Sequence, residues 1–410
     1  MNRRPHIAIA GAGIGGLTAA LALLRRGFAV TVFEQAPAFA EVGAGIQLSA
    51  NGTRCLFSLG LEGEIRERAS SAAGKEIRLW STGETWKLFD LGEQSVQRYG
   101  FPYLMMHRAD LHGILATAVE RAAPGTVRLG SRVVGHATSG DGVAVLHLDG
   151  RQEAGFDALV GADGVHSPLR RNLFGDDAPE FTGCMAWRGL IPAAKLPERL
   201  LRPVGTNWVG PGRHVITYPV RGGQMLNFVG IVERADWQME SWNVRGTREE
   251  CARDFEGWHE DVHLMIGAID EHSKWALMGR APMQRWGAGA VTLLGDACHP
   301  TLPFLAQGAM MAIEDGIVLA RCVEASPSDL TAAFSQYEAL RKGRTSQIVL
   351  KSAENARRFH NPALANADGA RDYVTREWQP DKVSERYGWL FEYDALGIPL
   401  AGRAEVHAPI

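Results

Sequence analysis

Residues 6–34 read HIAIAGAGIGGLTAALALLRRGFAVTVFE, and this stretch decides the fold. It predicts a short apolar strand at 6–10, a glycine-rich turn at 11–16, a helix at 17–26 and a β-branched strand at 29–33. A strand, a crossover helix and a second strand form the βαβ unit of an α/β domain. The chain is therefore expected to begin with a Rossmann-like unit.

The glycine-rich turn has the pattern GxGxxG, and an acidic residue follows it at a set distance. Gly11 allows the tight turn, Gly13 lets the backbone approach a pyrophosphate, and Gly16 lets helix and strand pack closely. Glu34 ends the second strand, 18 positions after Gly16, where its carboxylate can accept hydrogen bonds from a ribose. An ordinary glycine-rich turn would need neither the flanking strands nor the acid, so the stretch predicts a dinucleotide site.

Downstream segments continue the α/β pattern and then depart from it. Further strands are expected at 126–134, 143–148, 158–160 and 290–294, and helices at 110–122, 309–323 and 330–359. From about 182 to 280, short β-like runs at 184–191, 214–220 and 225–233 precede a helix at 248–269. That pattern predicts an antiparallel sheet with a helix laid on it. The tail after Asn361 shows no clear pattern.

Composition excludes several classes of protein. The chain has 410 residues, 46% of them hydrophobic, and a formal net charge of -3, which argues against a nucleic-acid binder. Glycines interrupt the apolar stretch after Arg4 and two arginines close it, so it indicates structure and not a secretion signal or a membrane span. The five cysteines form no CxxC pair, which argues against a zinc site or a disulfide framework and favours a cytoplasmic protein without a metal.

Two later motifs follow expected strands. Gly161-Ala162-Asp163-Gly164 comes directly after 158–160, where a simple tight turn is an equal alternative. GDACHP at 295–300 follows the next buried strand, and a loop rich in proline and glycine then enters a helix that carries Glu314 and Asp315. A carboxylate at a strand end, before a loop that feeds a helix N-terminus, fits a second contact region for a polyol phosphate.

Taken in order, the three motifs resemble those of the FAD-dependent, single-component aromatic hydroxylases. HRADL at 107–111 also matches in order and spacing, and the resemblance covers roughly residues 5–360. EVGAGIQLSAN at 41–51, MAWRGLIP at 185–192 and GPGRHVITYPVRGG at 210–223 are most similar to the branch of monohydroxybenzoate and salicylate hydroxylases, which includes 6-hydroxynicotinate monooxygenase.

The resemblance implies a Rossmann-like α/β FAD-binding domain, an inserted α+β substrate domain built on an antiparallel sheet, and a long C-terminal helix. The FAD-binding domain would be discontinuous, formed by residues 1–73, 101–181 and 281–360. The substrate domain would combine residues 74–100 and 182–280, with residues 361–410 as a C-terminal extension.

It also implies which residues hold the cofactor. The first turn would hold the FAD pyrophosphate, the acid after the second strand the adenosine ribose, and the later loops the ribityl chain and the isoalloxazine ring. The residues expected to contact FAD are Gly11, Gly13, Ile14, Gly15, Gly16, Glu34, Gln35, Arg108, Val133, Asp163, Gly164, Asp296, Pro303, Gly308, Ala309 and Met310. No second strand–GxGxxG–helix unit follows, so FAD would stay bound without a covalent link while NADH or NADPH visits transiently.

The chemistry implied is transfer of an OH group to an electron-rich ring from a flavin C4a-hydroperoxide, formed with NAD(P)H and O2. Removing the phenol proton makes the ring more nucleophilic, so a base beside it matters. His214 and Tyr218 lie four apart on an expected strand, hence on one face, and in the resembling enzymes this pair faces the substrate. His214 is the expected base and Tyr218 its hydrogen-bonding partner. A purely structural histidine is the alternative.

The expected pocket residues bear on the substrate. Relatives that hydroxylate 3-hydroxybenzoate at C6 have glutamine at the position of Pro303, and 6-hydroxynicotinate 3-monooxygenase has histidines at those of Gln47 and Phe304. Because this chain lacks all three groups, a salicylate-like hydroxybenzoate, hydroxylated with loss of CO2, is favoured over these two alternative activities. Arg188 and Arg213 are candidates to hold its carboxylate.

Proteins of another class remain as alternatives. A non-hydroxylating flavin reductase or a flavin-binding sensor could share the fold, although other flavin oxidoreductases are not expected to carry Asp163, Gly164 and Asp296 at these spacings. The expected partners are a small aromatic acid and O2, with no nucleic acid and no membrane. The chain is expected to be a monomer or a homodimer.

Overall fold

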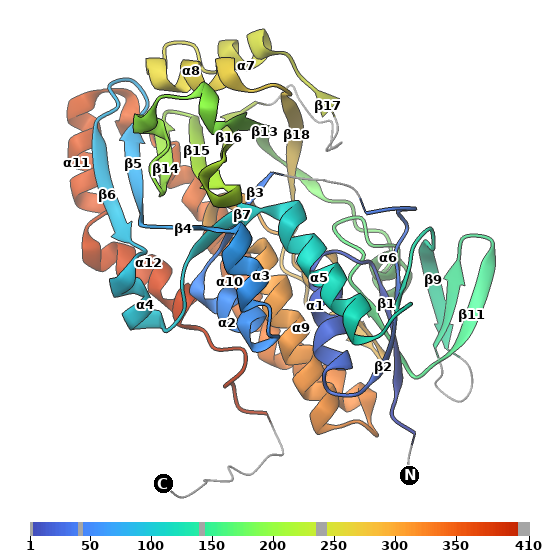
Figure 1. The fold of residues 1–410 in the computed structure, drawn as a ribbon. Coiled ribbons are helices and arrows are strands. Elements are labelled where there is room, and N and C mark those ends of the chain that lie inside the picture. The colour runs from blue at the N-terminus through green and yellow to red at the C-terminus, as the bar shows by residue number, and fades with distance from the viewer. Residues whose placement is uncertain (1–2, 40–43, 139–143, 235–243, 401–410) are drawn as a thin grey trace, which may run out of the picture.

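The computed structural model describes residues 3–39, 44–138, 144–234 and 244–400 (Figure 1). The first residues of the expected stretches 41–51 and 143–148 lie outside the described residues, as do 1–2, 235–243 and 401–410 of the expected domains. The helices are α1 Ile14–Leu24, α2 Ala50–Ser58, α3 Glu62–Arg68, α4 Glu93–Tyr99, α5 Arg108–Ala122, α6 Pro168–Phe174, α7 Arg248–Asp254, α8 Glu260–Ala268, α9 Gly308–Ala325, α10 Leu330–Phe359, α11 Ala367–Glu377 and α12 Pro380–Glu392.

The strands fall into four sheets. They are β1 His6–Ala10, β2 Ala29–Phe33, β3 Gly45–Leu48, β4 Ser70–Ser71, β5 Gly74–Leu79, β6 Thr85–Asp90, β7 Leu104–His107, β8 Val127–Arg128, β9 Val133–Thr138, β10 Ala144–Leu148, β11 Arg151–Phe156, β12 Ala158–Gly161, β13 Glu180–Pro192, β14 Val204–Gly210, β15 Arg213–Val220, β16 Met225–Glu233, β17 Val244–Arg245, β18 Ser273–Gly279, β19 Gly287–Ala288 and β20 Val291–Leu293.

The first large sheet brings the three motifs together. Its strand order is β19-β20-β12-β1-β2-β8, and β1 is parallel to both β2 and β12, while β12 is parallel to β20. The GxGxxG turn follows β1, the GADG turn follows β12, and the GDACHP loop follows β20. Because the carboxyl ends of parallel strands meet at one edge of a sheet, all three motifs lie side by side at the place where α/β sheets bind ligands.

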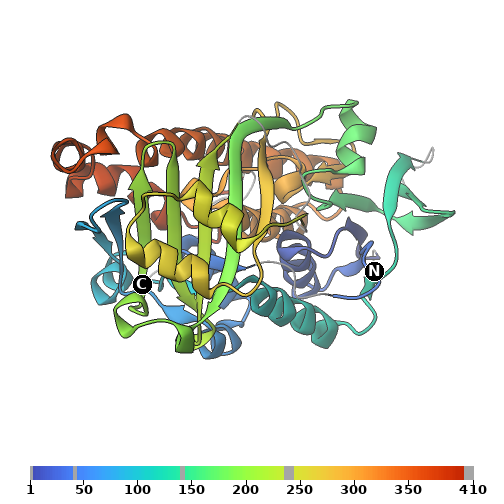
Figure 2. The same cartoon turned by 90° about the horizontal axis from the view of Figure 1, so that it is seen from above.

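The second large sheet carries eight strands, in the order β17-β18-β13-β16-β15-β14-β5-β6. Helices α7 and α8 lie across its outer face (Figures 1 and 2), where Phe255 and Met265 pack against Trp187 and Phe228. Side chains alternate between the two faces of each strand. Val215 therefore packs under α7 and α8, whereas Tyr218 faces inward.

The structure corrects three of the expectations. The helix expected at 248–269 is two helices, α7 and α8, with Gly257 at φ +79° in the break between them. The strand expected at 126–134 is divided between β8 and β9, which belong to different sheets, and Gly130 has φ +60° at the bend. The eight-stranded sheet is not wholly antiparallel, since β14 and β5 run parallel.

The chain after Asn361 forms ordered helices that complete the inner side of the eight-stranded sheet. A buried cluster joins these helices to Ile77 of β5. It includes Tyr373 of α11, Trp378 directly after α11, and Tyr387 and Phe391 of α12. Aromatic residues in this polar tail therefore mark packing positions. Within the described part of the chain, no helix combines the length and apolarity needed to cross a membrane.

Candidate active site

In the glycine-rich turn between β1 and α1, three glycines are in close contact with neighbouring atoms, and a fourth faces open space. A Cβ atom on Gly11, which has φ +101°, would lie 2.3 Å from the carbonyl oxygen of Ala162, and one on Gly16 would lie 2.0 Å from that of Gly11. A Cβ on Gly15 would lie 2.6 Å from the side chain of Leu294. A Cβ on Gly13 would meet no described atom within 4 Å.

Gly13 also stands at the N-cap of α1. Among the described residues, no side chain caps this helix, and its first turn has no acidic residue. The first N–H groups of α1, beginning at Ile14, therefore point into the space beside Gly13, where a phosphate group would find donors and the positive end of the helix dipole. The residues present fit a dinucleotide pyrophosphate.

Glu34 is built into the same turn. Its carboxylate accepts hydrogen bonds from the backbone N–H groups of Ala12, at 2.8 Å, and Ala36, at 2.9 Å. The contact with Ala12 ties the end of β2 to the turn after β1. Glu34 is only half-buried and Gln35 is exposed, so the edge expected to meet the ribose stays accessible.

The GADG turn after β12 holds a polar atom without a partner. The Oδ2 atom of Asp163 accepts a hydrogen bond from the N–H group of Leu169 at 3.1 Å, while its Oδ1 atom is buried and has no partner among the described residues. Burial raises the pKa of the Asp163 carboxyl. Gly164 has φ +80°, a conformation that favours glycine.

Arg108 and Asp296 lie where two strands end. Arg108 begins α5 after β7, and Asp296 follows β20. Both side chains are accessible, yet protein encloses them on several sides: burial lowers the pKa of Arg108, raises that of Asp296, and each charge offsets part of the shift of the other. An accessible pair of opposite charges in electrostatic reach of each other suits the polar chain of a cofactor.

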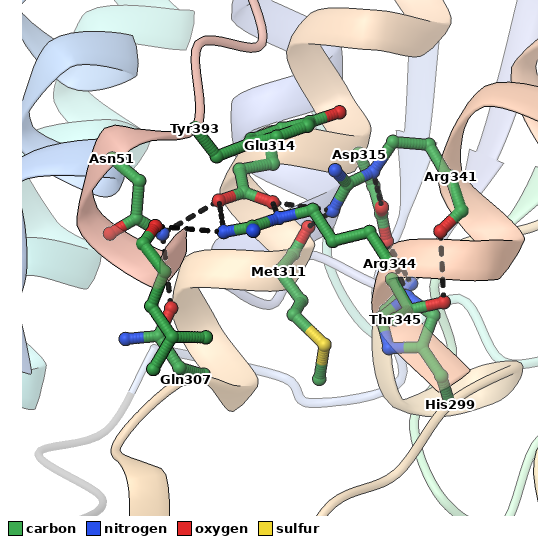
Figure 3. A network of polar contacts seen from close by, with 12 residues as sticks. Asn51, His299, Gln307, Met311, Glu314, Asp315, Arg341, Arg344, Thr345 and Tyr393 are labelled. Carbon is green, nitrogen blue, oxygen red and sulfur yellow. Dashed lines mark hydrogen bonds and ion pairs between the residues drawn. The ribbon is translucent and has the colours of Figure 1, made fainter. Parts of the chain in front are cut away.

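Asp315 holds the loop that carries Asp296 (Figure 3). The carboxylate of Asp315, on α9, accepts a hydrogen bond from the N–H group of Gly295 at 3.2 Å and lies 2.6 Å from Nε2 of His299. Gly295 and His299 flank Asp296 in the chain. The contact therefore holds Asp296 from both sides, and His299 serves to position this loop.

Two arginines of α10 balance the charges of α9 (Figure 3). Arg341 lies 2.7 Å from Asp315 and 2.6 Å from Glu314, and Arg344 lies 2.9 Å from Glu314, which also accepts from the amide of Asn51 at 2.6 Å. Burial alone would raise the pKa values of both carboxyls, but the arginines, with His299 beside Asp315, hold them below their usual values. The network links α2, α9 and α10.

The other residues expected to contact FAD lie in the loop after β20, at the start of α9 and at the start of β9. Pro303 is exposed in the loop after β20, Gly308 and Ala309 begin α9, and Met310 is buried against Gly52. Among the described residues, no side chain caps the N-terminus of α9. Val133 is buried at the start of β9.

A small cavity lies between this loop and the eight-stranded sheet. Its lining comes from β3, the eight-stranded sheet, the loop, and helices α10 and α12: Gln47, Lys75, Leu88, Asn207, Ile216, Pro303, Phe304, Leu305, Ala306, Phe359 and Tyr387. Ile216 lies between His214 and Tyr218 on β15, and the alternation of strand side chains places all three on this face. The expected catalytic pair thus lies on the face of the sheet that borders the cavity, although neither residue is among its described lining.

His214 is fully buried directly behind two residues that line the cavity. The centre of its ring lies 5.3 Å from that of Phe304 and 5.2 Å from that of Phe359. Its Nδ1 atom lies 2.6 Å from Nε2 of His360, whereas its Nε2 atom has no partner among the described residues. Burial lowers the pKa of His214 well below its ordinary value, and the neighbouring His360 lowers it further, so the ring is neutral near pH 7.

Tyr218 belongs to a chain of hydrogen bonds across the cavity. Gln47 accepts a hydrogen bond from the hydroxyl group of Tyr103 at 2.6 Å and also hydrogen-bonds to Tyr218. Burial raises the pKa of the Tyr218 phenol, although Arg188 and Gln47 act in the opposite direction. A Cβ on Gly45 would lie 2.4 Å from the ring of Tyr218, so this glycine makes room for it.

The two arginines expected at the substrate carboxylate are separated by the sheet. Arg188 faces inward and stacks on Trp275, with its guanidinium 4.3 Å from the ring centre. Burial, opposed by Tyr218 and reinforced by the charge of Arg108, lowers the pKa of Arg188 to about 10. Arg213 is next to His214 on β15 and points the other way, where it donates to the carbonyl of Asp254 on α7. The expectation that Arg213 reaches the substrate is wrong because of this alternation.

Sequence reasoning missed most of the cavity lining, including its polar side chains apart from Gln47. Lys75 and Tyr387 line the cavity itself, and His360 contacts His214 from the end of α10. Each lies far along the chain from the motifs and in a segment without a motif of its own. Only the inward position of Lys75 on a strand could have indicated it.

Similarity to known proteins identifies the family. The model of the FAD binding domain family matches residues 4–377. A 3-amino-4-hydroxybenzoate 2-monooxygenase of Streptomyces platensis is 41% identical over 401 residues, which cover 97% of this chain and 98% of that protein. The chain belongs to the FAD-dependent aromatic hydroxylases.

Two further similar proteins are also named as enzymes that hydroxylate aromatic acids. The 6-hydroxynicotinate 3-monooxygenase of Pseudomonas fluorescens is 35% identical, with 98% of both chains covered. A solved salicylate hydroxylase, in complex with its substrate, has a TM-score of 0.79 and 26% identity, with 96% of this chain and 97% of that one covered. The family expected from the three motifs is confirmed: the hydroxylase is an FAD-dependent aromatic monooxygenase, and NAD(P)H is the typical electron donor of its family.

Proposed function

We propose that the hydroxylase acts on a phenolic aromatic acid and that His214 takes up the phenol proton. The observation that carries this proposal is the arrangement of the His214 ring. One nitrogen is buried beside the cavity without a partner among the residues that the structure describes, and the other is hydrogen-bonded to His360. A neutral imidazole with one free nitrogen can accept a proton, and the same nitrogen would be costly to bury if nothing approached it. A substrate hydroxyl group is the partner we assign to it.

The cofactor site is proposed from the residues at the strand ends. Gly13, with Ile14 and Gly15, would hold the pyrophosphate, and Glu34 the ribose. Asp296 and Arg108 would hold the ribityl and phosphate region. The other residues in this proposal are Gly11, Gly16, Gln35, Val133, Asp163, Gly164, Pro303, Gly308, Ala309 and Met310. Bound FAD would supply the activated oxygen, without a covalent link to the chain.

The chain's own residues would then orient the substrate and handle its proton. Phe304 and Ile216 offer apolar walls for an aromatic ring, and Pro303 and Phe304 exclude water from one side. Tyr218 and Gln47 offer hydrogen bonds at the edge of the ring. Deprotonation by His214 raises the electron density of the ring at the moment when oxygen is transferred.

The proposed substrate domain is inserted into the proposed cofactor domain. Residues 74–100 and 182–280 would form the former, and residues 1–73, 101–181 and 281–360 the latter. Strands β5 and β6 support this division, because β5 pairs with β14, β6 pairs with β5, and both belong to the eight-stranded sheet. Residues 361–410 would form a C-terminal extension, of which Tyr387 lines the cavity.

Hydroxybenzoates are the substrates we propose, with or without an amino group. The Streptomyces platensis relative is named for 3-amino-4-hydroxybenzoate and the structural neighbour for salicylate. Two other reactions are disfavoured, namely 6-hydroxylation of 3-hydroxybenzoate and 3-hydroxylation of 6-hydroxynicotinate. The reason is that Pro303, Phe304 and Gln47 replace the polar side chains expected in enzymes with these activities.

The test is a screen of hydroxybenzoates, aminohydroxybenzoates and hydroxypyridine carboxylates for stimulated NADH or NADPH oxidation, with analysis of the products. We expect at least one hydroxybenzoate to yield a product carrying one more oxygen atom, in proportion to the NAD(P)H consumed. Oxidation of NAD(P)H that gives only hydrogen peroxide with every acid would contradict the proposed substrate class.

A further inference from the structure

Lys75 is a cation inside the cavity. It lies on β5 with its side chain on the inward face, and it lines the cavity together with Gln47, Asn207 and Phe304. Its Nζ atom lies 5.1 Å from the ring centre of Tyr103 and 5.9 Å from that of Phe89. Among the described residues, no acidic side chain forms an ion pair with it, so aromatic rings are its nearest compensation.

The outer face of the same strand is neutralised. Glu76, the next residue, accepts hydrogen bonds from Arg78 at 2.9 Å, from Arg202 at 2.5 Å and from the hydroxyl group of Thr206 at 2.9 Å. Within the described chain, the inward cation of this strand, Lys75, pairs with no carboxylate. The difference indicates that its counterion comes from outside the chain.

The free energy of burial supports the same reading. An ammonium group that is enclosed without an anion is destabilised, and burial lowers the pKa of Lys75 to about 7. The titratable groups that face it are the phenols of Tyr103 and Tyr387, and burial raises both their pKa values. A bound carboxylate would pair with the ammonium and restore its charge.

We propose that Lys75 binds the carboxylate of the aromatic substrate, and that the hydroxylase therefore takes acids whose carboxylate lies across the ring from the hydroxyl group. This inference rests on the proposed function. Lys75 pairs with Gly205 of β14, and because the next residue, Thr206, pairs with Thr217 of β15, Tyr218 falls in the same row as Lys75. Two strand spacings separate the backbones of Lys75 and Tyr218 by about 9–10 Å. A ring placed on this face of the sheet would present its carboxylate to Lys75 and its hydroxyl group toward β15, which carries both Tyr218 and the proposed base His214.

Gly205 makes room for the side chains of Lys75 and Met105 on the inward face. A Cβ atom there would lie 3.3 Å from the side chain of Lys75 and 3.2 Å from that of Met105. Arg188 is stacked on Trp275 and near Arg108, and Arg213 lies on the far face. Neither arginine lines the cavity. An ortho-hydroxybenzoate such as salicylate cannot reach Lys75 and Tyr218 at once, because its two groups are neighbours on the ring.

The test uses FAD-loaded enzyme and matched pairs of ligands. Dissociation constants of 4-hydroxybenzoate, 4-hydroxybenzamide and salicylate would be measured from the change in flavin absorbance, for the wild type, Lys75→Met, Lys75→Arg and Lys87→Met. Lys87 lies on the neighbouring strand β6 and is exposed in an ion pair with Asp90, so it is the matched control. We expect Lys75→Met to weaken binding of the acid roughly 10- to 100-fold, as loss of a charge-assisted hydrogen bond does. Binding of the amide should change less than about threefold.

A pH series gives a second readout that a merely space-filling lysine would not produce. Since the pKa of Lys75 is about 7, wild-type affinity for 4-hydroxybenzoate should fall as the pH rises above 7, whereas affinity for the amide should not. Lys75→Arg should bind the acid without this fall, because an arginine keeps its charge. The wild type should also bind 4-hydroxybenzoate more tightly than salicylate.

The outcomes separate the two proposals. One outcome would overturn only the role of Lys75 and leave the proposed function standing. In it, aromatic acids stimulate NAD(P)H oxidation, but Lys75→Met weakens binding of acid and amide equally or weakens neither. Tighter binding of salicylate than of 4-hydroxybenzoate would overturn the arrangement across the ring. A wild type that binds none of these ligands and oxidises no NAD(P)H in their presence would overturn the proposed function and this inference with it.

Discussion

The Nδ1 atom of His214 lies 2.6 Å from the Nε2 atom of His360, and Nδ1 of His360 lies 2.7 Å from a carboxylate oxygen of Glu233. His214 is buried beside the cavity, whereas the side chain of Glu233 is 55% exposed. The three side chains therefore join a buried strand position to solvent through two hydrogen bonds. A proton taken up on one nitrogen of His214 can be passed on from the other.

Replacing His214 tests its role as the base. We expect His214→Gln to bind FAD like the wild type, because His214 lies on the eight-stranded sheet, away from the strand ends that carry the cofactor motifs. Hydroxylation should slow by roughly 10²–10⁴-fold, the usual contribution of a general base. The ratio of hydroxylated product to NAD(P)H consumed measures the effect, with the difference released as hydrogen peroxide.

His272→Gln is the matched control for that variant. His272 is also a buried histidine on which burial lowers the pKa, but it contacts the carbonyl of Ile266 under α8, on the outer face of the sheet. This variant should keep the wild-type ratio of product to NAD(P)H. A His214→Gln enzyme that stays fully coupled at the wild-type rate would leave Tyr218 as the remaining candidate.

Glu233 should set the pH at which the path through His360 works. Burial lowers the pKa of His360, and Glu233 opposes this shift by hydrogen bonding to the ring and by its charge. Glu233→Gln removes that opposition, so the pKa of His360 should fall further and the acid limb of the hydroxylation pH profile should move to lower pH. Turnover should fall only a few-fold, since water can replace an exposed acceptor.

The measurement is product formation over a pH series from 5 to 8, with Glu271→Gln as the control. Glu271 is exposed and paired with Arg245 of the edge strand β17, whereas His214 lies on β15, with three strands between them. A Glu233→Gln profile that coincides with that of Glu271→Gln would show that no proton passes through His360.

Much of the cofactor region follows from local sequence, because each motif is carried by one strand and the turn after it. Strands β1 and β2 have the bounds that the apolar runs predict, and α10 likewise spans 330–359. The side-chain period of two places His214 and Tyr218 on one face without knowledge of the neighbouring strands. Local patterns of this kind do not depend on what packs against them.

The rest of the site depends on pairings between distant segments. Lys75 reaches the cavity only because β5 pairs in parallel with β14, more than a hundred positions later in the chain. Tyr387 comes from a helix whose aromatic residues carry no motif. The charges of Arg341 and Arg344 would suit the exposed face of a long helix equally well, and only the partners on α9 show that they are buried.

The glycines of the first turn should separate folding from cofactor binding. A Cβ on Gly13 meets no described atom within 4 Å, whereas one on Gly16 would lie 2.0 Å from the carbonyl oxygen of Gly11. We expect Gly13→Ala to leave the stability of the apoprotein near that of the wild type and to weaken FAD binding, because the methyl group would fill the phosphate space. Gly16→Ala should lower the unfolding temperature of the apoprotein itself.

Thermal unfolding of apoprotein and titration with FAD distinguish the two variants. The proposed pyrophosphate site at Gly13 would be refuted by a Gly13→Ala protein with wild-type FAD affinity. Loss of stability in Gly13→Ala equal to that in Gly16→Ala would show that both glycines serve packing alone.

Arg341 should be the most sensitive position in the fold outside the cavity. It is fully buried and pairs with Asp315 at 2.7 Å and Glu314 at 2.6 Å. Removing one partner of a buried ion pair leaves charges uncompensated, which typically costs about 3–5 kcal/mol. We therefore expect Arg341→Met to lose about that much unfolding free energy at pH 7.5, measured by urea denaturation. Arg245→Ala, which breaks an exposed ion pair with Glu271, should unfold like the wild type.

The loss in Arg341→Met should also depend on pH in one direction. The arginines hold the pKa values of Glu314 and Asp315 below their usual values, so the stabilisation is present above the pKa of the unfolded carboxyls, about 4, and is lost as the pH falls through the lower folded values. In the variant the carboxyls lack Arg341, and protonating them relieves the unpaired charge. The difference in unfolding free energy between wild type and variant should therefore shrink between pH 7.5 and pH 4. A difference that stays constant over this range would show that Arg341 stabilises the protein by packing, without a contribution from its charge.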